Sequence, residues 1–225
     1  MFGPRFEMAH TMILDEEQHG SFKIVMRGPQ DGDAEALASL MGSYTTQQFM
    51  LMRGTKTVKD EEEWLEKVRT NNDEVSWLIS VVMADKETLI GTTHLRTVDD
   101  YRLASGILLA DQDWWGKGIA TLTHKFRTWY AFREMGAYSI ESNFIWDNLA
   151  SGKALEKVGY VRCGVLPRYR LIAGEWRDQV LMICHNPVSK DLLWPGSSSP
   201  DSKIIRGMKQ TQQVLEDIDG LIQHR

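Results

Sequence analysis

The sequence predicts an α+β protein with a mostly antiparallel central sheet flanked by helices. Three consecutive apolar runs, at about 75–84, 88–98 and 102–110, are separated only by short polar stretches, which is typical of an antiparallel meander. Before and after them lie segments whose apolar residues recur at steps of three and four, the period of an amphipathic helix. With 225 residues, of which 42% are apolar, the chain can bury one sizeable core, or at most two small ones.

The first part of the chain is expected to contain an N-terminal arm over residues 1–20, then a strand and a helix. Residues 22–27 (FKIVMR) form an apolar run that a Gly-Pro pair closes. Asp31 is expected to cap the helix that follows, which ends near Met41.

A second helix is expected after a polar stretch. Thr57 and Asp60 have the spacing of a capping box, which opens a helix to about Arg69. The inner face of this helix would carry three apolar residues, Trp64, Leu65 and Val68.

The second half of the chain alternates helices and strands after the meander. A long amphipathic helix is expected over 117–135, where Gly136 ends it. The following elements are expected to be a strand at 138–145, a short helix at 149–158 that Gly159 stops, a strand at 160–166, and a hairpin at 168–184 that turns at Ala173-Gly174.

The composition changes after residue 187, which divides a domain over 21–187 from a C-terminal extension over 188–225. Residues 196–200 are expected to be a linker, followed by an amphipathic helix over 202–223. Its seam is apolar except for one threonine: Ile204, Met208, Thr211, Leu215, Ile218 and Ile222. The seam either folds back on its own core or pairs with a second subunit. The linker favours the second alternative, a homodimer.

Composition and charge exclude several classes of protein. The net charge of −5 argues against a nucleic-acid partner. No apolar run is long enough to span a membrane, and the N-terminus does not resemble a secretory signal, so a cytoplasmic protein is expected. The two cysteines, Cys163 and Cys184, are too few for a disulfide scaffold and wrongly spaced for zinc. Both are expected to be buried free thiols, and no metal site is expected.

Charge is divided unevenly along the chain. Residues 1–100 carry a net charge of −8, and residues 101–225 carry a net charge of +3. Such a division would allow a cationic ligand on one side and an anionic ligand on the other. Charges scattered for solubility explain the same numbers.

The most informative segment joins the third strand of the meander to the long helix. It reads ADQDWWGKGIAT over residues 110–121, with Gly116 and Gly118 at the start of the helix. Glycines let the backbone approach a ligand, and the unpaired N–H groups of a helix N-terminus bind phosphate oxygens. A nucleotide P-loop is excluded because Lys117 is followed by glycine, and a dinucleotide fingerprint fails because Thr121 replaces its third glycine.

Two later segments carry a family resemblance. Residues 147–160 read DNLASGKALEKVGY, and residues 175–181 read EWRDQVL. Together with the glycine turn, over about residues 21–185, the chain resembles the GNAT acyl-CoA N-acyltransferases. Within them it is most similar to the branch of the Rim-type ribosomal-protein N-terminal acetyltransferases. The resemblance implies a mixed, GNAT-like sheet in which two strands splay apart around the pantetheine arm of acetyl-CoA.

The same resemblance implies which residues bind this co-substrate. Strand backbone would pair with pantetheine at Leu108, Leu109 and Ala110. The pyrophosphate would lie on the N–H groups of residues 115–121: Trp115, Gly116, Lys117, Gly118, Ile119, Ala120 and Thr121. Trp115 departs from the usual Gln or Arg of the family. Lys117, Lys153 and Lys157 either meet the phosphates or are ordinary solvated lysines.

Two residues of the short helix match positions that act near the thioester. Asn148 matches an asparagine that binds the pantetheine amide, although helix capping would also explain an asparagine here. Ser151 matches a position from which a hydroxyl reaches the thioester sulfur. Many family members use a tyrosine one turn later, where this chain has Leu155.

The general base is the remaining catalytic role. Glu141 and Asn143 share one face of a strand, and Glu141 is the candidate base, acting through water. A carboxylate paired with an arginine or lysine explains the same residue. His94 is a minor candidate.

The resemblance implies an acetyl-CoA-dependent N-acetyltransferase in which a neutral amine attacks the thioester directly and strand N–H groups stabilise the oxyanion. The acceptor would be a protein N-terminus or a small cationic amine, and the acidic run Asp60–Glu63 suits a cation. The rival hypothesis is a non-catalytic acyl-CoA-binding or regulatory module. The presence of Asn148 and Ser151 argues against it.

Overall fold

The computed structural model describes residues 1–15, 18–42, 44–47, 54–189 and 201–223. The chain divides into two compact units, Met1–His94 with Ile107–Ile119, and Leu95–Gly106 with Ala120–Arg225. The eight strands form a mixed sheet, and β4 (Lys86–Thr97) and β5 (Arg102–Leu109) contribute residues to both units. The expected α+β class is confirmed. The linker expected over 196–200 lies outside the described residues.

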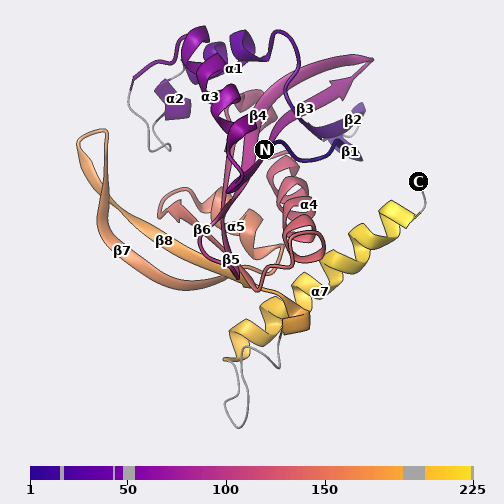
Figure 1. The fold of residues 1–225 in the computed structure, drawn as a ribbon, viewed down its shortest axis with the longest axis vertical. Coiled ribbons are helices and arrows are strands. Elements are labelled where there is room, and N and C mark those ends of the chain that lie inside the picture. The colour runs from indigo at the N-terminus through magenta and orange to yellow at the C-terminus, as the bar shows by residue number, and fades with distance from the viewer. Residues whose placement is uncertain (16–17, 43, 48–53, 190–200, 224–225) are drawn as a thin grey trace. The chain divides into compact units, whose positions relative to one another are not determined.

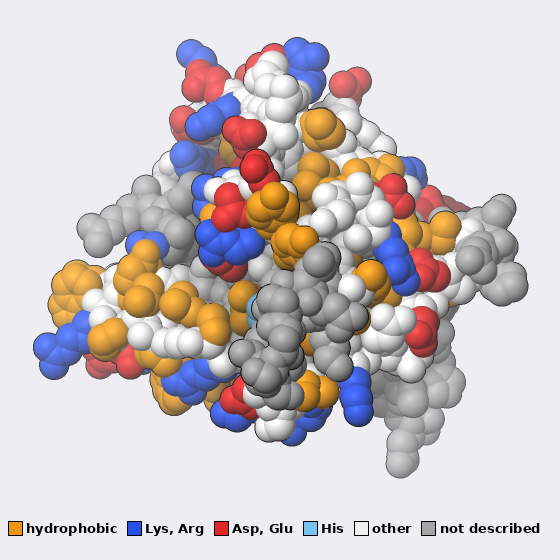
Figure 2. All heavy atoms as spheres, turned by 60° about the horizontal axis from the view of Figure 1, so that its bottom comes forward, with side chains coloured by type: hydrophobic (Ala, Val, Ile, Leu, Met, Phe, Trp, Pro, Cys, Tyr) orange, Lys and Arg blue, Asp and Glu red, His pale blue; other side chains and the backbone are white. Residues whose placement is uncertain are grey.

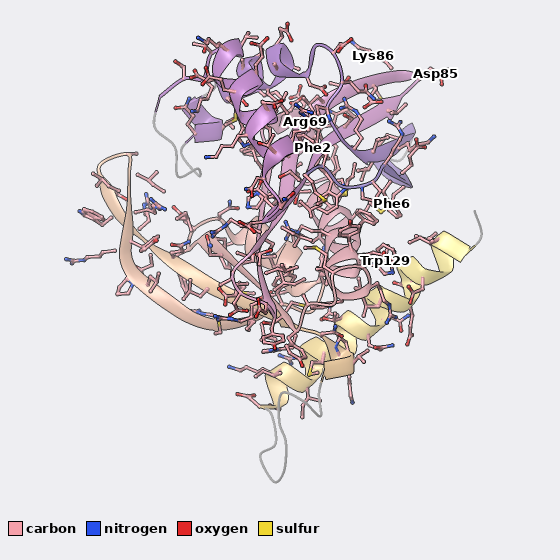
Figure 3. The ribbon with its side chains drawn as sticks, in the orientation of Figure 1. Phe2, Phe6, Arg69, Asp85, Lys86 and Trp129 are labelled. Carbon is pink, nitrogen blue, oxygen red and sulfur yellow. The ribbon has the colours of Figure 1, made fainter. Side chains whose placement is uncertain are left out.

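The first unit contains a strand within residues 1–20, which were expected to form an N-terminal arm. β1 (Phe6–Asp15) pairs antiparallel with β2 (Gln18–Arg27), which in turn pairs antiparallel with β3 (Glu74–Met83). Phe6 and Met8 are both buried, so the alternation of apolar residues at the start of β1 was a usable signal within the segment described as an arm. The turn between β3 and β4 places Ala84 and Asp85 at positive φ. Asp85 is labelled in Figure 3.

The helices of the first unit are α1 (Asp33–Met41), α2 (Tyr44–Gln47) and α3 (Val58–Thr70). The capping box of α3 is confirmed: Thr57 accepts from the Asp60 N–H, and the Asp60 carboxylate accepts from the Thr57 N–H. Val68 is buried, and Trp64 and Leu65 pack against a small core cluster of Leu37, Leu78 and Leu89.

The expected cap of α1 is wrong. The N-cap is Gly32, at φ 87°, and no side chain caps this helix. The acidic residue that makes a tertiary contact here is Asp33, two positions after Asp31, because its carboxylate binds Arg27. The two side chains form a buried two-point ion pair, with Nη1 to Oδ2 at 2.7 Å and Nη2 to Oδ1 at 3.0 Å.

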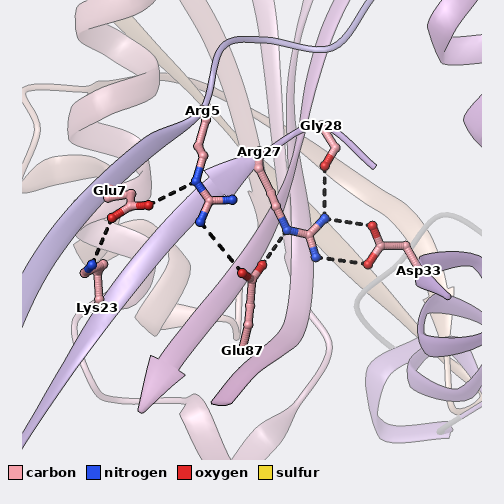
Figure 4. Close-up of polar contacts among 7 residues, drawn as sticks. All are labelled: Arg5, Glu7, Lys23, Arg27, Gly28, Asp33 and Glu87. Carbon is pink, nitrogen blue, oxygen red and sulfur yellow. Dashed lines mark hydrogen bonds and ion pairs between the residues drawn. The ribbon is translucent and has the colours of Figure 1, made fainter. Parts of the chain in front are cut away.

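Arg27 is the centre of a larger charge network (Figure 4). Its Nε also donates to Glu87, and its Nη1 donates to the carbonyl of Gly28. The network continues at the surface through Arg5, Glu7 and Lys23. Burial, the largest single effect, would raise the pKa of Glu87, but hydrogen bonds from Arg27 and Ser80 and the nearby positive charges of Arg27 and Arg5 together hold this pKa below its usual value. The network thus ties β1, β2, β4 and α1 together.

Replacing this arginine is expected to destabilise the protein strongly. Arg27→Met leaves the buried Asp33 without its cation, which costs about 3–5 kcal/mol. Arg27 also helps to hold the pKa of Glu87 below its usual value. This adds stability above the unfolded glutamate pKa of about 4.3, and the added stability is lost as the pH falls through the folded pKa of Glu87. The difference from wild type in urea unfolding should therefore shrink below about pH 4. Arg69→Met, which removes an exposed pair with Glu66, is the control, with an expected loss below about 1 kcal/mol. Equal losses in the two variants would contradict this account.

The second unit is built on β6 (Ser139–Ile145), β7 (Val161–Ile172) and β8 (Glu175–His185). β6 pairs in parallel with β5 over residues 102–104 and antiparallel with β8, which makes the sheet mixed, as the resemblance implied. The hairpin turn is confirmed, since Ala173 and Gly174 lie at φ 50° and 82°. The helices are α4 (Ile119–Arg133), α5 (Leu149–Glu156) and α7 (Ser202–Gln223).

β7 runs as one strand through Pro167, where the sequence analysis expected two segments. The register with β8 shifts between Leu166 and Arg170, and Arg168 lies at φ 50°. β7 is an edge strand of the sheet, and a proline with a local irregularity weakens such an edge as a template for further strands. Figure 2 shows hydrophobic side chains gathered along the hairpin, where the exposed ones are Leu166, Tyr169, Leu171 and Trp176.

The helix over 202–223 is confirmed as α7, but the favoured role of its seam as a dimer interface is wrong. Within one chain, Met208, Thr211, Leu215 and Ile218 are each at most 6% exposed, and α7 packs along β8 (Figure 1). The Thr211 hydroxyl donates to the carbonyl of Val158 at 3.1 Å, so the polar interruption of the seam has a partner in the core. The seam therefore folds back on the core of its own chain, which was the other alternative.

Polar contacts at the middle of the seam and near its C-terminal end accompany its docking in cis. Trp129 of α4 points toward α7, and its Nε1 donates to Asp219 at 2.7 Å (Figure 3). Arg133 also donates to Asp219. The thiol of Cys184 lies 3.2 Å from the Thr211 hydroxyl, and burial raises the pKa of Cys184 to about 12. Cys184 is a buried free thiol as expected, whereas Cys163 is exposed.

No helix among the described residues is long and apolar enough to cross a membrane.

Candidate active site

The turn between β5 and α4 is the first part of the candidate site, and up to residue 119 it belongs to the first unit. Gly116 lies at φ 73° and Gly118 at φ 79°, on either side of Lys117, whose φ is not positive. Alternation of this kind turns successive N–H groups toward one side and forms a concavity that binds anions. A Cβ added at Gly116 would meet nothing within 4 Å, so the backbone there is open to a ligand.

The N–H groups of this turn are not equally available. The N–H of Trp115, which was expected to bind pyrophosphate, donates to the carbonyl of Gln112 at 3.0 Å. Those of Gly116 and Gly118 have no acceptor within the part of the chain that the structure describes. Ile119, Ala120 and Thr121 form the first turn of α4, where N–H groups lack helical partners.

The end of β5 is the second part of the candidate site. The N–H of Ala110 donates to Ile90 of β4, and its carbonyl accepts from the Thr46 hydroxyl, so both of its backbone groups are engaged within the unit. The carbonyl of Leu108 lies against Gly91 of β4. Of the three residues expected to pair with pantetheine, Leu109 is therefore the one whose backbone points away from β4.

The two tryptophans of the turn make different contacts. The ring of Trp114 lies edge-on to Phe22 at 5.3 Å, with the Lys117 ammonium 4.7 Å from its centre. The indole N–H of Trp115 donates to the carbonyl of Leu109 at 2.8 Å. Trp114 is thus a packing residue, and Trp115 links the turn to the strand.

In the second unit, Asn148 caps α5, which is one of the two roles expected for it, the other being pantetheine binding. Its Oδ1 accepts from the N–H of Ser151 at 3.2 Å. Asp147 does not cap the helix, because its carboxylate pairs with Arg177 at 2.8 Å. The amide nitrogen of Asn148 has no acceptor among the residues described, so its two N–H groups can donate to a ligand. Capping and ligand binding are therefore compatible.

The remaining residues of α5 separate into core and surface. Ser151 is half-buried next to the cap, whereas Leu155 is 1% exposed and belongs to the core. Lys153 and Lys157 are exposed. Ser151 is thus the hydroxyl that α5 offers for chemistry.

The candidate base is held in an ion pair. Oε1 of Glu141 lies 2.9 Å from Nη1 of Arg102, and Arg102 also binds Asp99 at 2.8 Å. Arg102 could not be found from the sequence, because it lies 39 positions before Glu141. The parallel pairing of β5 with β6 brings the two residues together. Asn143 is exposed, and His94 lies half-buried on β4 in the other unit. No group of three metal-ligating side chains occurs in the described ranges.

This chain matches one family model and is similar in sequence to known N-acetyltransferases. The model for the acetyltransferase (GNAT) domain matches residues 23–161. The probable N-acetyltransferase YjcK of Bacillus subtilis is 30% identical over 134 residues, which cover 59% of this chain and 71% of the relative. The [ribosomal protein uS5]-alanine N-acetyltransferase of Escherichia coli is 26% identical over 200 residues, which cover 83% of this chain and 97% of the relative.

Among solved structures, the spermidine N-acetyltransferase of Vibrio cholerae in complex with CoA and spermine superposes with a TM-score of 0.63. It is 20% identical, over 72% of this chain and 95% of the other. At this identity the similarity is one of fold.

Proposed function

The chain belongs to the acetyltransferase (GNAT) domain family, and from that premise we propose that it transfers the acetyl group of acetyl-CoA to the α-amine of a polypeptide. The family confirms the resemblance noted in the sequence, and the chain is an N-acetyltransferase with acetyl-CoA as its co-substrate and an amine as its acceptor. The proposal concerns which amine it uses and which residues act.

The ion pair between Glu141 and Arg102 supports an α-amine as acceptor. A carboxylate tied to an arginine is poorly placed to remove a proton from a strongly basic amine. An α-amine, with a pKa near 7.8, is roughly 15% neutral at pH 7, whereas a lysine amine is only about 0.04% neutral. An α-amine therefore needs little help from a base. The relative that acetylates an alanine of ribosomal protein uS5 is consistent with this choice.

The turn between β5 and α4 is proposed to bind the diphosphate of acetyl-CoA. The N–H groups of Gly116, Gly118 and the first turn of α4 would hold the pyrophosphate, because they are unpaired donors at a helix start. The Leu109 backbone and the amide nitrogen of Asn148 would bind pantetheine. Lys117 and Lys153 would add positive charge.

The chemistry proposed is direct transfer. The neutral amine forms a C–N bond to the thioester carbonyl, the C–S bond breaks, and the thiolate of CoA leaves and takes up a proton that the Ser151 hydroxyl delivers or orients. The amine proton passes to water. Glu141 stays a candidate base for this last step, acting through water.

An acceptor panel tests the proposal. The initial rate of CoA thiol release is measured with three acceptors: a peptide with a free α-amine, the same peptide acetylated at its N-terminus and carrying a lysine, and spermidine. The free α-amine peptide is expected to give the highest kcat/KM at pH 7. A higher value for spermidine would overturn the acceptor, and no thiol release with any amine would favour the non-catalytic module.

Ser151→Ala is expected to lower kcat by roughly tenfold to a hundredfold with CoA affinity nearly unchanged. The thiol of CoA, with a pKa near 8.5, is already a fair leaving group, so the hydroxyl helps only modestly. The measurement is single-turnover acetyl transfer, in which chemistry limits the rate. A variant with full kcat would leave Ser151 with a structural role only.

Asn148→Ser is expected to separate the two functions of this asparagine. Serine keeps an oxygen that can cap α5 but removes the amide N–H groups, so the Kd for CoA should rise about threefold to tenfold with little change in Tm. Asn148→Ala, which removes the cap as well, should also lower stability by about 1 kcal/mol. Calorimetry showing wild-type affinity in Asn148→Ser would remove this residue from the ligand site.

A homodimer and a cytoplasmic location remain predictions. Light scattering on the full chain tests the first, and fractionation tests the second.

A further inference from the structure

The contact between Trp115 and Leu109 is a local feature that the proposed chemistry does not use. The indole N–H donates to the Leu109 carbonyl at 2.8 Å, although the residue is 40% exposed. An exposed indole does not need this bond for its own burial. Its orientation is therefore set by the acceptor rather than by packing.

The acceptor is the one carbonyl of the strand end that points away from β4. The neighbouring groups, the Leu108 carbonyl and the Ala110 N–H, lie on the β4 side. Since a carbonyl has two lone pairs, Leu109 can accept from the indole and still accept from a ligand amide.

The bond closes a short loop that ends where the anion-binding turn begins. Within residues 109–115, Asp111 caps a 3-10 helix, Gln112–Trp114, and the Trp115 N–H donates to Gln112. Trp115 is thus held through both its backbone and its side chain. The next residue is Gly116, whose positive φ and unpaired N–H open the turn.

We propose that Trp115 is a positioning residue of the CoA site: its indole, bound to the Leu109 carbonyl, holds the Gly116–Gly118 turn in the conformation that receives the diphosphate. This inference rests on the proposed function, because it takes the turn to be the diphosphate site. Trp115 acts through Leu109 and the turn, and its own N–H groups do not touch the diphosphate. A turn fixed before binding does not lose conformational freedom when the ligand arrives.

The test compares two tryptophan variants. Trp115→Phe keeps a ring but removes the N–H, and the Kd for CoA and the KM for acetyl-CoA are expected to rise about threefold to tenfold, with kcat within about twofold of wild type. Trp114→Phe is the matched control, because its ring contacts with Phe22 and Lys117 do not involve its N–H. Its KM should match wild type.

A rescue separates positioning from general packing. Trp115→Gln is expected to recover most of the affinity lost in Trp115→Phe, since the glutamine amide supplies an N–H donor at a similar distance from the backbone. Equal KM values for Trp115→Phe and wild type would overturn the role, as would a fall in kcat with unchanged KM, or no rescue by glutamine. A wild-type protein that binds no CoA by calorimetry would overturn the proposed function and this role with it. Wild-type affinity in Trp115→Phe would overturn only the role.

Discussion

Gly118→Pro is expected to abolish CoA binding, with affinity lowered at least a hundredfold, while the protein stays folded. The substitution removes an unpaired N–H of the turn. It also forces a φ near −65° on a residue that lies at 79°. The concavity formed by alternating φ signs cannot survive this change, because the donors on either side would no longer point the same way. Calorimetry with CoA measures the loss.

Two comparisons keep this prediction specific. Circular dichroism and Tm should show that Gly118→Pro retains the fold, since Gly118 is exposed and the distortion is confined to the turn. Gly118→Ala keeps the N–H but strains the backbone at positive φ, so it should lose only part of the affinity. CoA affinity equal to wild type in Gly118→Pro would show that the turn is not the binding site.

Removal of the C-terminal helix is expected to destabilise the protein severely without changing the number of subunits in its assembly. Truncation after Trp194 removes four buried apolar side chains of α7, each contributing roughly 1.5–3 kcal/mol, and exposes the surface they cover; they are Met208, Val214, Leu215 and Ile218. That total is comparable to the whole stability of an ordinary domain. Denaturant unfolding should show a severe loss, and light scattering should show the mass of the shortened chain with the same number of subunits as the full chain. A drop to a smaller assembly would return α7 to an interface role.

A pair of glycines within α7 offers a finer version of the same test. A Cβ on Gly207 would lie 2.6 Å from the carbonyl oxygen of Gly159 and 2.8 Å from Cγ1 of Val161, so Gly207→Ala should destabilise by about 1–3 kcal/mol. Gly220 in the same helix has nothing within 4 Å, so Gly220→Ala should stabilise by up to about 1 kcal/mol. Similar effects of the two substitutions would contradict close docking of α7 in cis.

Local features of the fold were predictable because their causes lie within a few residues. The capping box at Thr57 and Asp60, the hairpin turn at Ala173-Gly174 and the helix end at Gly136 each depend on side chains or φ values near one another in sequence. The glycine turn of the site belongs to the same class. Its positive φ values follow from its residue types.

Choices between equivalent neighbours were not predictable. Asp31 and Asp33 are both acidic residues before a helix, and Arg27 on the preceding strand decides that Asp33 is engaged and buried. Asp147 and Asn148 are both good caps, and Arg177, thirty residues later, draws Asp147 away. In each case a distant arginine selects one of two candidates.

The sequence by itself determined the family and the order of nearly all strands and helices. These depend on residue type, short spacing and periodicity, which the chain carries locally. Only the tertiary structure decided which polar groups are already engaged: Glu141 by Arg102, Leu109 by Trp115, and Thr211 by Val158. Hydrogen bonds and ion pairs act over about 3 Å, and strand register and helix docking, rather than sequence distance, determine which groups come that close.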